Sequence, residues 1–123
     1  AGVDENHDDL LRSCFADDLI APGFRREPIV GVDAWMEFLR SQLSPFISTQ
    51  HMLSPVLATI DGDAAQTRTD LQSMHLYREP EGQVLLVFGT YNTGMVRRNG
   101  RWNSCASAPW RAWPLARPWR SKA

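Results

Sequence analysis

The chain has 123 residues, of which 43% are hydrophobic and 22% charged, a balance typical of one globular domain and not of a disordered chain. Its formal net charge of −1 supplies no overall basic field for a nucleic-acid backbone, so we expect no nucleic-acid partner. No apolar run approaches the roughly 20 residues of a membrane-spanning helix, and the acidic first residues lack the apolar segment of a signal peptide.

Two helical patterns are predicted in the first third of the chain. Asn6 suits the N-cap of the first, whose apolar stripe comprises Leu10, Leu11, Cys14 and Phe15. The second begins after Gly31 and ends before Pro45, with one apolar face formed by Val32, Trp35, Met36, Leu39 and Leu43. Residues 19–30, between the helices, are expected to form a short strand or an irregular pair of strands.

The rest of the chain is predicted to be β-structure. The expected segments are a strand at 51–60, a hairpin turn at 61–63, a strand at 64–77, a turn at 79–82, a long strand at 83–98 with bulges or bends at Gly89 and Gly94, a turn at 99–100 and a last strand from Trp102. Helices followed by an antiparallel meander predict an α+β domain over residues 1–108. We expect a cone-shaped, curved antiparallel sheet wrapped around the helices, with an apolar small-molecule pocket inside.

Residues 109–123 form a separate tail, in which three tryptophans, three prolines and three arginines fall within twelve residues. One interpretation is an aromatic, basic arm for RNA or a polyproline segment for a protein partner. The favoured interpretation is an extended terminus that packs across its own domain or a dimer mate, since prolines at this density exclude a helix or a central strand.

His51 is the first candidate for chemistry. An imidazole titrates near neutrality and can act as a general base, and a carboxylate such as Asp4 could orient its ring. Each residue also has a structural interpretation: His51 as a hydrogen-bonded residue at a strand start, and Asp4 as part of the acidic cap of the first helix. The other histidines, His7 and His75, are not spaced for a metal site, and we expect neither metal nor cofactor. Cys14 is expected to be a buried free thiol, which favours a reducing cytoplasm.

Strand alternation predicts which residues share a face. With a bulged turn at 61–63, the face of His51 would also carry Leu53, Leu57, Thr67, Thr69, Leu71, Ser73 and His75. The opposite face would carry Gln66, Arg68, Asp70 and Gln72, which suits solvent or a subunit interface. A slip of one residue would exchange these faces on the second strand.

Several segments, taken in order, resemble the SnoaL-like branch of the NTF2-like superfamily, which includes polyketide cyclases, scytalone dehydratase and hexachlorocyclohexane dehydrochlorinase. The matching segments are Gly2-Val3-Asp4, Phe15–Asp18, Gly31, Thr49-Gln50-His51, Asp61–Ala65, Gly89-Thr90-Tyr91 and Arg97–Trp102. The similarity spans about residues 2–103, with no full helix ahead of Asp4 and no basic residue in 103–107, where the dehydrochlorinase has one.

The resemblance implies a catalytic pair of Asp4 and His51, because the dehydratase and dehydrochlorinase members use such a pair. It also implies a pocket, for which we expect the substrate-binding residues Trp35, Leu53, Leu71, His75, Phe88 and Tyr91. The predicted function is a cofactor-independent lyase or isomerase that takes a proton from an apolar cyclic or polycyclic substrate, in a homodimer or higher homo-oligomer. The rival prediction is a non-catalytic ligand-binding or dimerisation module of the same fold.

Overall fold

A computed structural model describes residues 2–107 of the chain, so the predicted tail at 109–123 lies outside the described residues. The elements in chain order are α1 (Asp8–Arg12), β1 (Phe15–Ala21), β2 (Ile29–Val30), α2 (Val32–Leu43), β3 (Phe46–Leu53), β4 (Leu57–Asp61), β5 (Ala64–Tyr77), β6 (Val84–Arg98) and β7 (Arg101–Ser107). Both helices precede the run of strands from β3 to β7, and β1 and β2 lie between the helices, so the domain is α+β, as expected.

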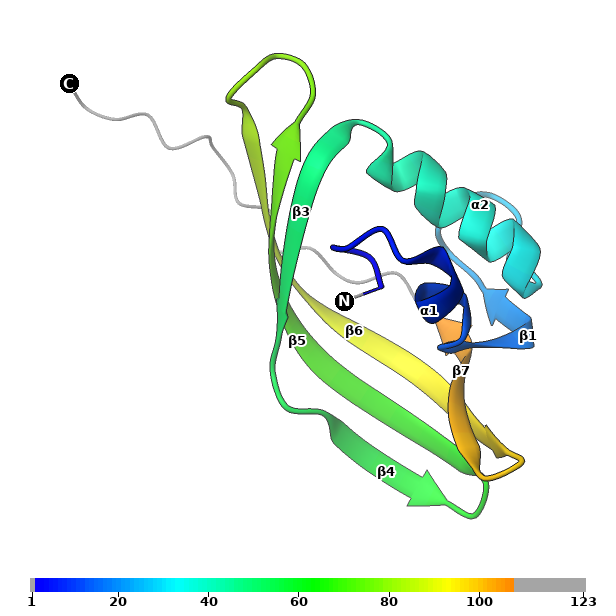
Figure 1. The fold of residues 1–123 in the computed structure, drawn as a ribbon. Coiled ribbons are helices and arrows are strands. Elements are labelled where there is room, and N and C mark those ends of the chain that lie inside the picture. Colours follow the sequence, from blue (N-terminus) through cyan, green and yellow to red (C-terminus); the bar gives the residue numbers. More distant parts are fainter. Residues whose placement is uncertain (1, 108–123) are drawn as a thin grey trace.

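One curved, unclosed sheet contains all seven strands (Figure 1), in the order β2-β1-β7-β6-β5-β3, with β4 also paired to β5. The strands β3 to β7 pair with one another only in antiparallel fashion, as predicted. The sheet as a whole is nevertheless mixed, because β1 lies parallel to β7. This pairing joins the two ends of the domain, so local turn signals could not predict it.

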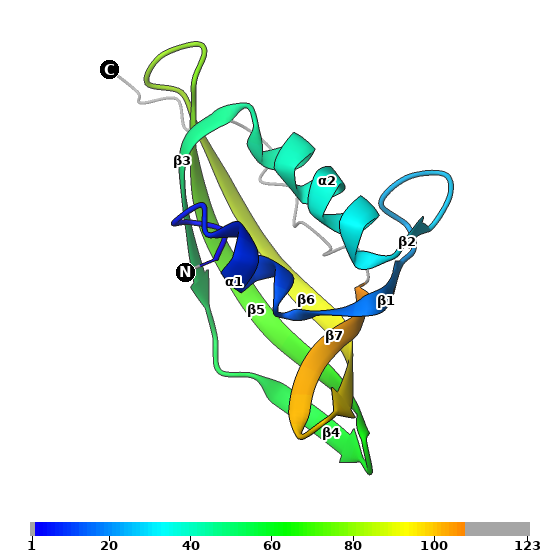
Figure 2. The ribbon, with the colours of Figure 1, turned by 45° about the vertical axis from the view of Figure 1, so that its right-hand side comes forward.

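The helix α2 lies on the concave side of the sheet, near β1 and β2, in both views (Figures 1 and 2). It begins after Gly31, whose φ of +87° is a conformation that glycine adopts without strain. Trp35 of α2 packs with Leu19, Ala21 and Ile29 to form a buried cluster. Three residues of the predicted apolar face of α2, namely Val32, Trp35 and Met36, are therefore buried.

Several local predictions need correction. The helix α1 has its N-cap at His7 rather than Asn6 and ends at Arg12, because Phe15 belongs to β1. Cys14 is a free thiol but is exposed rather than buried.

The predicted strand at 51–60 is divided into β3 and β4 by residues 54–56. The ladder of β5 and β6 continues in register through Gly89, whereas the pairing of β6 and β7 shifts at Gly94.

The register places His51 opposite Ser73, and Leu53 opposite Leu71. Directly paired residues point to the same side of a sheet, so these side chains face the concave side with His75, as predicted. Leu57 is the exception, because it pairs with Arg68 and so faces the convex side. Within residues 2–107 no helix has the length and apolar character needed to cross a membrane.

Candidate active site

Asp4 lies in the N-terminal turns and reaches across to β3, where three donors surround its carboxylate. Its Oδ1 accepts a hydrogen bond from the Thr49 hydroxyl at 2.9 Å and lies 2.6 Å from Nδ1 of His51. Its Oδ2 accepts a hydrogen bond from the backbone N–H of His51 at 2.8 Å. The same carboxylate therefore holds both the backbone and the ring of His51.

These contacts fix the protonation of Asp4. Burial raises its pKa, but the hydrogen bonds from the His51 backbone, the His51 ring and Thr49 outweigh burial and leave the pKa below its ordinary value of 3.8. The carboxylate is an anion at neutral pH, and an anion only accepts hydrogen bonds. The proton of a neutral His51 ring therefore lies on Nδ1, which leaves the lone pair of Nε2 available as a base.

His75 of β5 and Tyr91 of β6 lie on the same concave face. The ring centroids of His51 and His75 are 5.2 Å apart, and His75 is 8% exposed, with Nδ1 buried and without a partner among the described residues. Burial and the neighbouring His51 lower the pKa of His75, so the His75 ring is neutral at neutral pH. Burial and the charge of Asp4 raise the pKa of Tyr91, which keeps its hydroxyl protonated as a hydrogen-bond donor.

Two predicted substrate-binding residues lie elsewhere. Phe88 pairs with the exposed Gln72 and thus points to the convex face, away from His51. Trp35 is 4% exposed and packs edge-on against Phe15 and Phe24 in the core, with ring centroids 5.9 and 5.1 Å away. By contrast, Leu71 lies buried, and Leu53 exposed, on the same face as His51.

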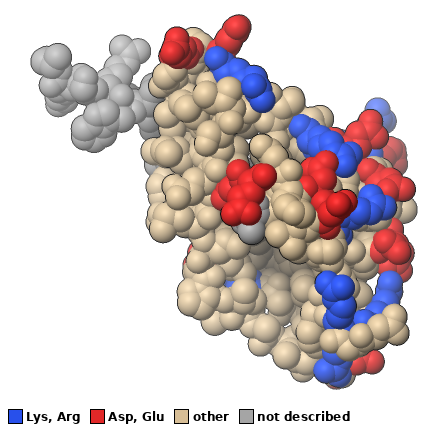
Figure 3. All heavy atoms as spheres, viewed as in Figure 1, with Lys and Arg blue, Asp and Glu red and all other residues tan. Residues whose placement is uncertain are grey.

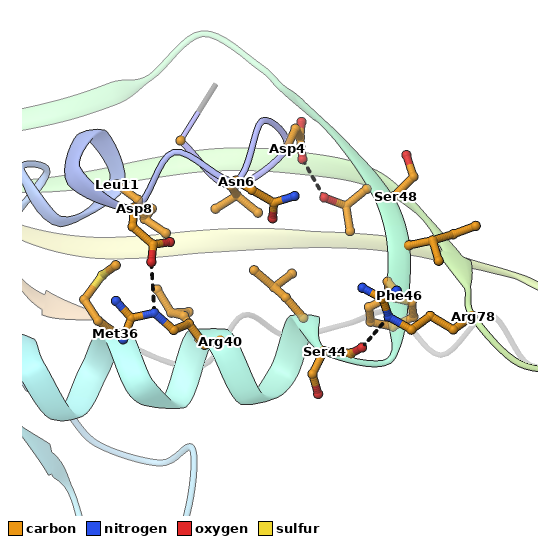
Figure 4. Close-up of a pocket in the computed structure, with 16 residues that line it drawn as sticks. Asp4, Asn6, Asp8, Leu11, Met36, Arg40, Ser44, Phe46, Ser48 and Arg78 are labelled. Carbon is orange, nitrogen blue, oxygen red and sulfur yellow. Dashed lines mark hydrogen bonds and ion pairs between the residues drawn. The ribbon is translucent and has the colours of Figure 1, made fainter.

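A hollow of about 230 Å³ lies beside this group, between the N-terminal segment, α2 and β3 (Figure 4). Its walls include Asp4, Thr49, Phe46 and Arg78, whereas His51 does not line it. The close-up shows Asp4 on the side of the hollow opposite Ser44 at the end of α2, where the Asp4 carboxylate accepts the hydrogen bond from Thr49. Asp4 thus borders this hollow and also contacts His51. Figure 3 shows a second hollow in the surface below the N-terminal segment, bordered mainly by uncharged atoms.

A family model described as a SnoaL-like domain matches residues 1–106. The chain belongs to the SnoaL-like family. No curated protein sequence matches it. The SnoaL-like domain is similar to a provisionally named scytalone dehydratase from Novosphingobium aromaticivorans, at 22% identity and a TM-score of 0.79, covering 91% of this chain and 74% of that chain.

Two further solved structures are similar to this SnoaL-like domain. The hexachlorocyclohexane dehydrochlorinase LinA-type3 from Novosphingobium barchaimii is 16% identical, with a TM-score of 0.75 over 93% of this chain and 82% of that chain. A protein from Kribbella flavida is 22% identical, with a TM-score of 0.78 over 90% of this chain and 80% of that chain. Likeness at these identities shows the fold, which confirms the curved α+β architecture.

Thr49 is the site residue that the sequence analysis missed in this SnoaL-like domain. It precedes His51 by two residues on the same strand, so both side chains face the same side of the sheet. That spacing could have indicated a hydroxyl beside the carboxylate that binds His51. The buried Ser73, directly opposite His51 on β5, was placed on the correct face, and its hydroxyl lacks a hydrogen-bond partner among the described residues.

Proposed function

We propose that this protein is a cofactor-independent lyase or isomerase in which His51 takes a proton from a carbon of an apolar cyclic substrate. The observation that carries the proposal is the 2.6 Å contact between Asp4 and Nδ1 of His51, which leaves Nε2 as the basic nitrogen. No described residue forms a hydrogen bond with that nitrogen. A substrate on the concave face could therefore contact Nε2 without breaking a hydrogen bond within the described residues.

In the proposed reaction, Nε2 of His51 forms a bond to the proton as the carbon–hydrogen bond breaks. The released electron pair forms a carbon–carbon double bond and expels a halide ion, or a hydroxide that leaves as water with the proton of the imidazolium. In an isomerisation the electron pair instead forms an enolate, and the imidazolium returns the proton to another carbon. Asp4 stabilises the imidazolium without taking its proton. General-base catalysis of this kind contributes roughly 10²–10⁴ in rate.

The substrate would lie against Leu71 and Leu53, with His75 and Tyr91 close to its polar group. A neutral His75 and a protonated Tyr91 suit a hydroxyl, carbonyl or halide better than a second charge. Membership of the SnoaL-like family and likeness to structures named as a dehydratase and a dehydrochlorinase support this class of reaction. The hollow behind Asp4 could receive a part of the substrate remote from the reacting carbon.

One observation favours a second candidate, a non-catalytic ligand-binding module. The 230 Å³ hollow includes Asp4 among its walls but not His51. A ligand held entirely in that hollow would contact Met36, Leu39 and Phe46 without reaching the base. Asp4 would then serve to hold β3 in place rather than to orient a catalytic ring.

The test is to find ligands among small cyclic ketones, alcohols and halides by thermal shift, and then to assay them for elimination or for exchange of a carbon-bound proton with deuterium. We expect turnover in the parent and none in His51→Ala, with folding almost intact because this side chain is partly exposed. The matched control is His7→Asn, which replaces an exposed histidine with another N-cap residue and should keep full activity. Exchange that persists in His51→Ala would refute the mechanism, and binding without chemistry in the parent would favour the second candidate.

We also propose a homo-oligomeric state, which the resemblance implies, and a cytoplasmic location. The free thiols of Cys14 and Cys105 are compatible with a reducing compartment.

A further inference from the structure

The hollow between the N-terminal segment, α2 and β3 combines an apolar lining with charged residues at its two ends (Figure 4). Met36 of α2 and Phe46 of β3 contribute to the apolar lining. At one end, Arg40 donates a hydrogen bond to the Asp8 carboxylate at 3.0 Å, and the two charges form an ion pair. At the other end lies Arg78, which directly follows β5. The kind of ligand that the hollow would bind therefore depends on which of these charges is unpaired.

Arg78 is a cation without an ion-pair partner among residues 2–107. Its backbone N–H donates a hydrogen bond to the carbonyl of Pro45 at 2.9 Å, and its Nε donates one to the carbonyl of Ser44 at 3.0 Å. These bonds hold the side chain at the end of α2, beside Phe46 (Figure 4). A guanidinium has five N–H donors. The four on Nη1 and Nη2 have no acceptor among the described residues, so they are available to a ligand.

The two carboxylates at the hollow have no such free capacity. Asp8 is paired with Arg40, and Asp4 accepts three hydrogen bonds spread over both of its oxygens. A cationic ligand would have to displace these donors, whereas an anionic ligand would meet the free N–H groups of Arg78. In Figure 4, Asp4 lies on the side of the hollow opposite Ser44, the residue that Arg78 contacts. An anion bound at Arg78 is therefore separated from the Asp4 carboxylate.

We propose that the hollow binds a small organic acid whose carboxylate pairs with Arg78 and whose one or two rings lie against the apolar lining. Because Nε is bonded to Ser44, the carboxylate binds the outer end of the guanidinium, with one oxygen at Nη1 and the other at Nη2. The rings contact Met36 and Phe46, and the ring of Phe46 allows a stacked or edge-to-face aromatic contact. Since its own hydrogen bonds already hold Arg78 in place, little side-chain freedom is lost on binding.

The volume of the hollow limits the size of the acid. The hollow measures about 230 Å³, whereas a cavity of roughly 150 Å³ holds a benzene ring and drug-sized ligands fill roughly 300–1,000 Å³. One or two rings therefore fit, and three or more fused rings do not. The acid is thus smaller than the polycyclic substrates considered from the sequence.

Binding of an acid in the hollow does not depend on the proposed chemistry, because His51 does not line the hollow. The acid should therefore bind to His51→Ala as tightly as to the parent. Loss of turnover and loss of acid binding are separate results, measured by the proton-exchange assay and by calorimetry respectively. The acid also gives the non-catalytic candidate described above a defined class of ligand.

The test is isothermal titration calorimetry of the full chain with 2-naphthoate and with 2-naphthamide, which has the same rings but no charge. We expect the acid to bind roughly tenfold more tightly, a difference of about 1.4 kcal/mol, because charge-assisted hydrogen bonds are stronger than neutral ones. The exposure of Arg78 to water limits the preference to this size. Arg78→Gln should abolish the preference and leave the affinity for the amide unchanged, which would show that the hollow keeps its shape.

The matched control is Arg68→Gln, which removes the same charge ten residues before Arg78, on the convex side of β5. At roughly 3.3 Å per strand residue, the two positions are about 33 Å apart along the chain, several times the Debye length of roughly 10 Å. The preference for the acid should therefore remain in this variant. Thermal unfolding followed by circular dichroism checks that both variants fold.

NMR of the methionine and leucine methyl groups locates the acid in the parent, without any substitution. We expect 2-naphthoate to shift the methyl signals of Met36 and Leu39, which line the hollow. Shifts confined to Leu53 and Leu71 would place the acid on the concave sheet face and would overturn the inference. Equal affinity for acid and amide, a preference that survives in Arg78→Gln, or no binding of the acid at millimolar concentration would overturn it as well.

Discussion

Replacing Asp4 by asparagine should change the tautomer of His51, and the structure shows why. The carboxylate accepts hydrogen bonds at both oxygens, two donors at Oδ1 and one at Oδ2. An amide has only one oxygen, and its nitrogen is a donor. If the amide oxygen takes the position of Oδ2, the ring meets an N–H group and must present an unprotonated Nδ1. The ring proton then moves to Nε2, and the base is lost.

The cost to stability can be estimated from the same contacts. Hydrogen bonds to a charged group contribute about 1.5–3 kcal/mol each, and asparagine keeps some of them in weaker form. Because the Asp4 side chain is 21% exposed, water compensates part of the loss, and we expect Asp4→Asn to cost roughly 1–3 kcal/mol. At about 4 °C or more per kcal/mol for a domain of this size, Tm should fall by roughly 4–12 °C.

The pH dependence follows from the direction of the pKa shift. The pKa of Asp4 is lower in the folded protein than in the unfolded chain, so its stabilisation is complete above the ordinary value of 3.8 and is lost as pH falls through the folded pKa. Parent and Asp4→Asn should therefore differ most in unfolding free energy near neutral pH. The difference should shrink below about pH 4.

Two measurements check this reasoning. Nitrogen NMR of the imidazole should report the proton on Nδ1 in the parent and on Nε2 in Asp4→Asn, and urea titrations give the unfolding free energies. The control is Asp63→Asn, whose carboxylate is 72% exposed and pairs with Arg97, and which should cost less than about 1 kcal/mol without changing the ring. An Asp4→Asn protein with an unchanged tautomer would refute the argument that the carboxylate fixes the base.

Two further predictions concern stability. The pKa of His75 lies below its ordinary value of 6.5, so the folded protein binds fewer protons than the unfolded chain, and stability falls as pH drops below about 6.5. In His75→Phe this dependence should be weaker, measured by urea titration at pH 5.5 and 7.5, and an unchanged slope would contradict a neutral His75. Ile29→Ala should cost about 2–4 kcal/mol because Ile29 is fully buried, whereas Ile20→Ala, at a residue 49% exposed, should cost less than half as much by thermal unfolding.

Elements with a strong local signal could be predicted from the sequence. The apolar repeat of α2 and the turns at 61–63 and 99–100 are set by neighbouring residues, so their positions agree with the structure. The parallel pairing of β1 with β7 joins Phe15 to Ser104, 89 positions later, and Ile20 to Ala106, 86 positions later, and periodicity carries no information about such contacts. The helix α1 ends at Arg12, and the same pairing accounts for this end, because Phe15 pairs with β7 and cannot continue the helix.

In the candidate site, too, features set by neighbouring residues could be predicted and features set by distant contacts could not. The face shared by His51, Leu71 and His75 agrees with the prediction, but the bulge expected at 61–63 is absent. Asp61 pairs directly with Ala64, and the register changes by one residue between β4 and β3 instead. The contact of Asp4 with His51 came from the family resemblance, because no local pattern joins residues 47 positions apart. Phe88 was misplaced because its face depends on which residue of β5 it opposes. Trp35 lies in the core, which is the more common place for an aromatic residue in the apolar stripe of a helix.

The hydrogen bond from the His51 backbone to Asp4 has a consequence for how the protein opens. Among the described strands β3 lies at the end of the sheet, and its outer amides have no neighbouring strand. At the amide of His51, the carboxylate of Asp4 accepts the hydrogen bond that a neighbouring strand would otherwise accept. If the N-terminal turns detach, this amide meets water and the ring loses its anchor in the same event. The hydrogen-exchange rate of a single amide therefore reports the fraction of molecules in which the proposed base is correctly held.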